Sequence, residues 1–218
     1  MIFKTIETGS AGNAFLLDDL MIDCGLSWKK ILHAAKKTSW VLLTHEHGDH
    51  LCIATLRKIV AIHSVGIVCG QWLKDALVSR GVPDDDIVIV EAGGIYEIGE
   101  YTISPIHAPH DVPNFGYRIM KDGWRHLHIT DSATLEGITA KNYDSASIEC
   151  NHHRGRALEL IKEADDEGIF THLKGAINSH LSVEEVIEFC KANRIKKLYP
   201  VHIGSSTRDE VISALKAW

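Results

Sequence analysis

The stretch Thr44-His45-Glu46-His47-Gly48-Asp49-His50 places three histidines and an aspartate within six residues. It directly follows the apolar run 40–43, and a short apolar run rich in strand formers indicates a buried strand that ends in a turn. His45 and His47 can point at one ion, whereas Asp49 and His50 lie beyond Gly48 and can point at a second. Imidazole and carboxylate suit Zn²⁺, Mn²⁺ and Fe, and the lack of cysteine here disfavours a closed structural zinc site. An incidental polar loop is the other interpretation, which the dense spacing disfavours.

The length and composition predict one domain over residues 1–218. Of the 218 residues, 45 % are hydrophobic and 24 % are charged, which is ordinary for a globular protein. No apolar run approaches the roughly 18 residues of a membrane span. The segment Met1–Glu7 lacks the apolar core of a signal peptide, and the five cysteines are odd in number and scattered. We therefore expect a cytoplasmic protein with reduced cysteines and no membrane partner.

The net charge of −6 does not by itself indicate a nucleic-acid binder. Two divalent ions would move it to −2 and make the site attractive to phosphate groups. Five groups of cations are candidates for contacts with a nucleic-acid backbone, and such contacts would be sensitive to salt. Lysine pairs on a helix, however, commonly form only a solvated face. The candidate cations are Lys29-Lys30, Lys36-Lys37, Arg118, Arg154 and Arg156.

The order of strands and helices predicts an α/β fold with two sheets and helices on the outer faces. Strands are expected at 3–7, 14–17, 20–23, 40–43, 67–69, 87–90, 95–98, 101–103, 115–120, 124–129, 146–149 and 197–201. Helices are expected at 27–35, 51–62, 71–80, 156–167, 182–193 and 207–217. Ser182 with Glu185, and Thr207 with Glu210, have the spacing of a capping box.

The motif H-x-H-x-D-H after a hydrophobic strand and a threonine resembles the first motif of the metallo-β-lactamase-fold hydrolases. The resemblance implies a four-layer αββα sandwich and two bound divalent ions. Zinc or manganese is expected, and the ligand set also accommodates iron, magnesium or nickel. It implies that His45, His47 and His110 bind metal one, that Asp49, His50 and His202 bind metal two, and that Asp131 bridges them.

Two of these positions have alternatives. His107 competes with His110, although the His-Asp phrase followed by Gly-Tyr favours His110. Asp131 could instead be the N-cap of a helix.

Further residues are expected to act beside the ligands. Thr44 and Glu149 are expected to orient imidazole N–H groups, as is His152, for which a surface position is equally open. His180 resembles the additional histidine of the phosphodiesterase branches, where it donates a proton or stabilises charge without binding metal; a polar loop histidine is the alternative. Asp49 is expected to be catalytic, since its loss should empty metal two.

Four phrases narrow the resemblance to the YycJ/WalJ-type bacterial branch, compact relatives of ribonuclease Z with deoxyribonuclease activity. They are Gly9–Asn13, Met21–Ser27, Glu149–His152 and Ser179–Ser182. The branch implies a 5′-to-3′ exonuclease that uses a hydroxide held between two ions on a DNA substrate. The chain departs from the branch at Ser132-Ala133, Cys150 and His153, which leaves the metal set intact and puts substrate details in doubt.

Other functions share this ligand set, because a fold does not fix a function. A small-ester hydrolase, such as a lactonase or a glyoxalase II-like thioesterase, would not need His180 or the turn at 9–13. A tRNA-processing enzyme would be expected to carry a long Gly/Pro-rich insertion, which is absent, and a cyclic phosphodiesterase stays open. A non-catalytic binding protein would be expected to have lost ligands. A β-lactamase is disfavoured because no signal sequence would bring it to the periplasm. The sequence leaves open the choice of DNA or RNA, the choice of exonuclease or endonuclease action, and the oligomeric state.

Overall fold

Parallel β-strands position the candidate site residues in both units into which the chain divides. The computed structural model describes residues 1–218. The first unit comprises Met1–His107 and Val112–Trp124, and the second comprises Ala108–Asp111 and Arg125–Trp218.

The first unit contains a six-stranded sheet with the order β1-β2-β3-β4-β5-β6. The strands β1 to β3 form an antiparallel meander, and the strands β3 to β6 run parallel. Their bounds are β1 Phe3–Glu7, β2 Ala14–Leu17, β3 Leu20–Ile22, β4 Trp40–Leu42, β5 Gly66–Cys69 and β6 Ile87–Ile89. The predicted strands are thus confirmed to within one or two residues, and β4 ends where the predicted metal motif begins.

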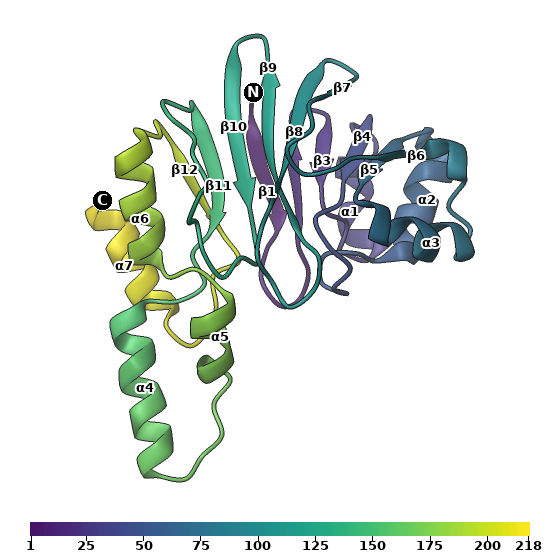
Figure 1. Ribbon diagram of the computed structural model, residues 1–218. Helices are drawn as coiled ribbons and strands as arrows, with labels where there is room; N and C mark the ends of the chain where they lie inside the picture. The colour runs from purple at the N-terminus through teal and green to yellow at the C-terminus, as the bar shows by residue number, and fades with distance from the viewer. The chain divides into compact units, whose positions relative to one another are not determined.

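Three helices connect the parallel strands, because a parallel pair cannot be joined by a tight hairpin. They are α1 Trp28–Ala35, α2 Ile53–His63 and α3 Gln71–Ser79, and the 3₁₀ turn Asp84–Asp86 leads into β6. Figure 1 shows α2 and α3 together beside β5 and β6. Ile31, Leu56 and Leu73 are fully buried in one core with Val41 and Ile67, so each helix packs its apolar side on this sheet.

An antiparallel meander completes the first unit. It consists of β7 Tyr96–Ile98, β8 Tyr101–His107 and β9 Phe115–Lys121. The Tyr117 hydroxyl donates to the Leu43 carbonyl at 2.5 Å, and the Phe115 amide donates to the Thr44 carbonyl at 3.1 Å. These bonds fix β9 against the chain that leaves β4, so they also hold the start of the metal motif.

Three parallel strands form the sheet of the second unit. These are β10 Trp124–Ile129, β11 Ser145–Glu149 and β12 Leu198–Val201, with Ile129 opposite Ile148 and Glu149 opposite Val201. The helices α4 Arg154–Asp166, α5 Leu173–Ser179 and α6 Val183–Asn193 connect β11 to β12, and α7 Arg208–Ala217 ends the chain. In Figure 1, α6 and α7 lie beside β11 and β12.

A buried polar ladder runs along β10 and β11. The His126 ring bonds the Ser145 hydroxyl at 2.8 Å and the Ser147 hydroxyl at 2.9 Å, and His128 Nδ1 lies 2.7 Å from the same Ser147 hydroxyl. Burial lowers the pKa of His126 to about 3, so the ring is neutral at ordinary pH. Hydrogen bonding makes these buried imidazoles tolerable in the sheet.

Two details of the helices differ from the prediction. Helix α5 was not predicted, because its seven residues include Gly175 and only Leu173 is buried, so it has no apolar periodicity. The Ser182 capping box of α6 is confirmed, but the one at Thr207 does not form. The Thr207 hydroxyl instead accepts a hydrogen bond from the His153 amide at 2.9 Å.

All five cysteines are free and four are buried, as expected of packing residues. None of the helices combines the length and the apolar character needed to cross a membrane.

Candidate metal centre

The residues of the predicted metal motif occupy the loop that leaves β4. Because β3 and β4 are parallel neighbours, with Ile22 opposite Leu42, their carboxyl ends meet at one edge of the sheet. Asp23 follows β3 there, and its amide donates to the Leu42 carbonyl at 2.8 Å. This register brings the fully buried Asp23 carboxylate under Thr44, the first residue of the motif.

Asp23 orients two of the predicted ligands. One carboxylate oxygen accepts from the Thr44 amide at 2.9 Å and from the Thr44 hydroxyl at 2.9 Å, and the other lies 2.6 Å from His50 Nδ1. His50 Nδ1 therefore carries the proton, which leaves the Nε2 lone pair for a metal. The Thr44 hydroxyl also lies 2.9 Å from His45 Nδ1, so the same carboxylate holds His45 through Thr44. This supports the predicted orienting role of Thr44.

Asn13 contacts the other side of the motif. Its side-chain amide nitrogen lies 2.8 Å from His50 Nε2 and donates to Asp49 Oδ2 at 3.1 Å. The Asn13 backbone amide donates to the Asp49 carbonyl at 2.6 Å. The predicted turn at 9–13, which has positive φ at Gly9 and Gly12, therefore holds Asp49 and His50 in place.

The imidazoles of the motif are close enough to share metal ions. The His45 ring centre lies 4.8 Å from that of His47 and 4.3 Å from that of His50. His45 and His50 are fully buried, whereas Glu46 is exposed. The first unit thus gathers three imidazoles and the Asp49 carboxylate into one small loop.

The second unit gathers its predicted residues by the same topology. Asp131 lies two residues beyond β10, Glu149 ends β11, and His202 directly follows β12, so all three meet at the carboxyl edge of parallel strands. Asp131 Oδ1 lies 3.2 Å from His202 Nδ1 and 3.3 Å from His180 Nδ1. The ligand atoms of Asp131, Glu149, His180 and His202 all lie within 4.8 Å of one another. No helix begins directly after Asp131, so the alternative of a helix N-cap is wrong.

Glu149 anchors this cluster. One of its carboxylate oxygens accepts from the Ser132 amide at 2.6 Å and from the Leu181 amide at 3.2 Å, and the other accepts from His180 Nδ1 at 2.9 Å. Burial raises the pKa of Glu149, but the bonds from His180 and His202 outweigh this and lower it. Burial likewise lowers the pKa of His180, but the Glu149 carboxylate outweighs it and raises the pKa. The Glu149 carboxylate therefore favours the protonated form of His180 and fixes its ring, which supports the orienting role predicted for Glu149.

His110 and His107 differ in their surroundings. His110 has a nearly buried side chain, with its ring centre 5.5 Å from that of His180 and its Nε2 atom 3.0 Å from Asp111 Oδ1. His107 is exposed at the end of β8. These surroundings support His110 as the ligand.

His152 is buried, so the surface alternative is wrong. Neither of its ring nitrogens has a hydrogen-bond partner, and its backbone pairs with Ser182 in an isolated bridge. Burial lowers the pKa of His152. No hydrogen bond in the structure joins its ring to a predicted ligand, and the orienting role stays a prediction.

The backbone is strained at three of these residues. Asp23, Asp131 and His202 have φ values of 58°, 51° and 49°, in the left-handed region that residues other than glycine rarely adopt. Such strain is often found where side chains must be aimed at a site.

Sequence reasoning missed the roles of Asp23 and Asn13. Asp23 lies 21 residues before its partner Thr44, and Asn13 lies 37 residues before its partner His50. A carboxylate directly after the apolar strand Leu20–Ile22 was the available signal for Asp23.

The donor sets of both units fit divalent metal ions. Imidazole nitrogens and carboxylate oxygens are the preferred ligands of Zn²⁺ and Mn²⁺. The buried Asp23 carboxylate also bonds His50 Nδ1, as partners of metal-binding histidines do.

Comparison with known proteins adds independent information. The family model described as a β-lactamase superfamily domain matches residues 19–203, which include residues of both units. The curated exodeoxyribonuclease WalJ of Streptococcus pneumoniae strain D39 is 29 % identical over 238 aligned positions, which cover 93 % of this chain and 81 % of that protein.

Solved structures confirm the predicted fold class. The metallo-β-lactamase fold protein YhfI from Bacillus subtilis matches with a TM-score of 0.76 and 18 % identity over 99 % of this chain and 91 % of that one. The short form of human tRNase Z matches with a TM-score of 0.70 and 16 % identity over 93 % of this chain and 92 % of that one.

Proposed function

Because the chain belongs to the β-lactamase superfamily, we propose that it is a two-metal phosphodiesterase that degrades DNA as a 5′-to-3′ exonuclease. The chain is a hydrolase of that superfamily, and its similarity to a WalJ exodeoxyribonuclease supports the choice of DNA. The observation that carries the proposal is the His180–Glu149 pair beside Asp131, because an ester hydrolase of the same ligand set does not need it.

The proposed metal ligands are those expected from the sequence. His45, His47 and His110 would hold one ion, Asp49, His50 and His202 the other, and Asp131 both. Zinc or manganese fits this mixture of imidazole and carboxylate. When bound, the two ions supply an activated water as nucleophile and neutralise charge on the attacked phosphoryl group.

His180 is proposed as the proton donor. Glu149 raises its pKa and fixes its ring through Nδ1, so the Nε2–H is free to be aimed at a leaving oxygen. A 3′ hydroxyl leaving as an alkoxide needs such a donor, and a protonated imidazole also stabilises negative charge on the phosphoryl group. Glu149 acts through His180 and is a positioning residue.

Asp49 is proposed to hold the second ion in place. The Asn13 side chain donates to one Asp49 carboxylate oxygen, and the Asn13 backbone amide donates to the Asp49 carbonyl. The Asp49 carboxylate therefore has little conformational freedom. Because the Asp49 side chain is already ordered, it can bind the metal ion without a further loss of conformational entropy. A cytoplasmic location is part of the proposal and accords with the free cysteines.

The test is digestion of linear duplex DNA labelled at either the 5′ or the 3′ end, with Mn²⁺ or Zn²⁺ present. A 5′-to-3′ exonuclease releases a short labelled product at once from the 5′-labelled strand and shortens the 3′-labelled strand progressively. A lactone and a thioester serve as comparison substrates. Hydrolysis of either one, with no cleavage of DNA, RNA or an aryl phosphodiester, contradicts the proposal.

A further inference from the structure

A cationic groove on the first unit extends from the end of the metal motif along α2. Its lining includes Cys52, Ile53, Arg57, Ser79 and Arg80, and its volume is about 750 Å³. No carboxylate lines this groove. Cys52 lies only two residues beyond His50, so the groove begins where the motif ends.

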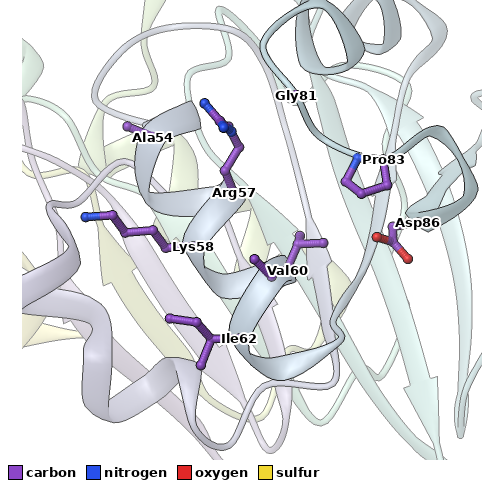
Figure 2. A pocket seen from close by; sticks show the side chains of 9 residues that line it. Ala54, Arg57, Lys58, Val60, Ile62, Gly81, Pro83 and Asp86 are labelled. Carbon is purple, nitrogen blue, oxygen red and sulfur yellow. The ribbon is translucent and has the colours of Figure 1, made fainter.

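A second hollow of about 470 Å³ continues from it past Arg57, and Figure 2 shows its lining. Lys58 projects on one side of the Arg57 side chain in this view, and Pro83 and Asp86 lie on the other side. The only carboxylate in the lining, Asp86, is therefore at the end away from Lys58.

The cations of the groove are not neutralised by the protein. Arg57, Lys58 and Arg80 are exposed, and none of them forms an ion pair. Some other cations of the chain, by contrast, pair with carboxylates. The nearby Lys74, for instance, pairs with Asp84 at 2.8 Å.

Several cations that the sequence suggested for nucleic-acid contacts are already engaged. Lys30 pairs with Glu7 at 2.6 Å, Arg154 pairs with Glu185 at 2.7 Å, and Arg156 bonds Glu159 and Glu163. Binding a phosphate would require each of them to give up a carboxylate. Lys29, Lys36 and Lys37 form no ion pair but line neither hollow.

The local backbone also positions Arg57. Gly81 has φ of 86°, and a Cβ atom there would lie 3.3 Å from Arg57 Cζ, so the guanidinium packs closely over a residue that has no side chain. A planar guanidinium held in this way can bind a phosphate through two parallel N–H bonds.

We propose that this groove binds the phosphodiester backbone of a nucleic-acid substrate outside the metal site, with Arg57 and Arg80 as the phosphate contacts and Lys58 beside them. The inference rests on the proposed function. Helix α2 rises about 1.5 Å per residue, so Arg57 lies about 7.5 Å along it from Cys52, or about two nucleotides at 3.4 Å per step. A substrate that occupies both the metal site and the groove at Arg57 must therefore be longer than a small phosphodiester, so the groove should select a polymer.

The test compares wild type with Arg57→Gln/Arg80→Gln. DNA binding is measured by fluorescence anisotropy in an Asp49→Ala background, so that the DNA is not cut, over a range of salt concentrations. Each lost phosphate contact reduces the slope of log K against log salt by about 0.9 for duplex DNA, so the double variant should lose about 1.8. With Asp49 intact, Arg57→Gln/Arg80→Gln should have a higher KM for DNA than wild type, while its turnover of bis(p-nitrophenyl) phosphate stays within twofold of wild type. Lys162→Gln/Lys191→Gln is the control, because it also removes two positive charges and both lysines lie on helices of the second unit.

An unchanged salt slope and KM in Arg57→Gln/Arg80→Gln, with wild type cutting DNA normally, would overturn this inference alone. An equal loss of bis(p-nitrophenyl) phosphate turnover would also overturn it, because the substitutions would then act on the metal site. A wild type that cuts neither DNA nor the small diester overturns the proposed function and this inference together. Circular dichroism and thermal unfolding of each variant check that it folds, and Arg57→Lys provides a milder second variant that should keep part of the slope.

Discussion

Asp23→Asn is the change that most sharply tests how the buried carboxylate prepares the metal motif. Asp23 accepts two hydrogen bonds from Thr44 and one from His50 Nδ1 at 2.6 Å. The asparagine oxygen can keep the bonds from Thr44, and its NH₂ group then faces the Nδ1–H of His50. Two donors oppose one another, so the ring must rotate or move its proton to Nε2.

Either response removes a metal ligand. A proton on Nε2 occupies the lone pair that would bind the ion, and it also faces the Asn13 amide 2.8 Å away. Loss of such an orienting partner typically weakens metal binding by about 10–100-fold. That factor corresponds to about 1.4–2.7 kcal/mol for the ion that His50 binds. The ion at His45 should be affected less, because Thr44 keeps its acceptor.

The assay is a competition titration of each protein with a chelating dye, together with the number of ions retained per chain. Urea unfolding of the metal-free proteins separates the metal effect from a folding cost, which should be about 1–3 kcal/mol for an unpaired buried donor. Asp19→Asn is the matched control, because Asp19 bonds Tyr101 in the same unit. If folded Asp23→Asn binds two ions with the affinity of wild type, the Asp23 carboxylate does not prepare His50 for a metal ion.

Three further changes test other parts of the account. His180→Gln should lower kcat for DNA by about 10²–10⁴-fold with both ions retained, as metal analysis and steady-state kinetics would show. His126→Gln should make stability less sensitive to acid, because burial lowers the pKa of His126 from 6.5 to about 3. Its contribution is complete above pH 6.5 and is lost as the pH falls, by about 1.4 kcal/mol between pH 7.5 and 5.5 in urea unfolding. Ser182→Ala should cost about 1 kcal/mol in the same assay, and Ser27→Ala less, because only Ser182 forms a side-chain cap bond.

The contradicting results are distinct. Unchanged kcat in His180→Gln would remove the proton-donor role and with it the observation that carries the proposed function. Equal acid sensitivity in His126→Gln and wild type would mean that the buried ring becomes protonated within the folded protein. Equal losses in Ser182→Ala and Ser27→Ala would show that the capping bond contributes nothing to stability.

Local signals were enough to predict most strands and helices. The hairpin 14–22, the strand before the metal motif and the capped start of α6 at Ser182 each carry their own pattern of apolar residues and turn formers. The capping box at Thr207 has the right spacing but does not form, because the Thr207 hydroxyl bonds the His153 amide, which is distant in sequence. Helix α5 carries no periodicity from which it could be predicted.

The candidate metal centre, like the fold, could be predicted from the sequence only in part. The dense motif at 44–50 identifies itself, and Glu149 could be assigned an orienting role from its place at a strand end. Asp23 could not, because its contact with His50 follows from the parallel register of β3 and β4. The unpaired state of Arg57 likewise depends on which carboxylates the fold brings near, which the sequence alone does not state.

The most direct test of the two-metal phosphodiesterase is the metal content and activity of Asp49→Ala beside wild type. Duplex DNA labelled at the 5′ end is incubated with each protein and Mn²⁺, and the ions bound per chain are counted on the same samples. Wild type should hold two ions and cut the DNA, whereas Asp49→Ala should hold one ion and leave the DNA uncut. Cleavage by Asp49→Ala at the wild-type rate, or a wild type with two ions that cuts no phosphodiester, would contradict the two-metal proposal.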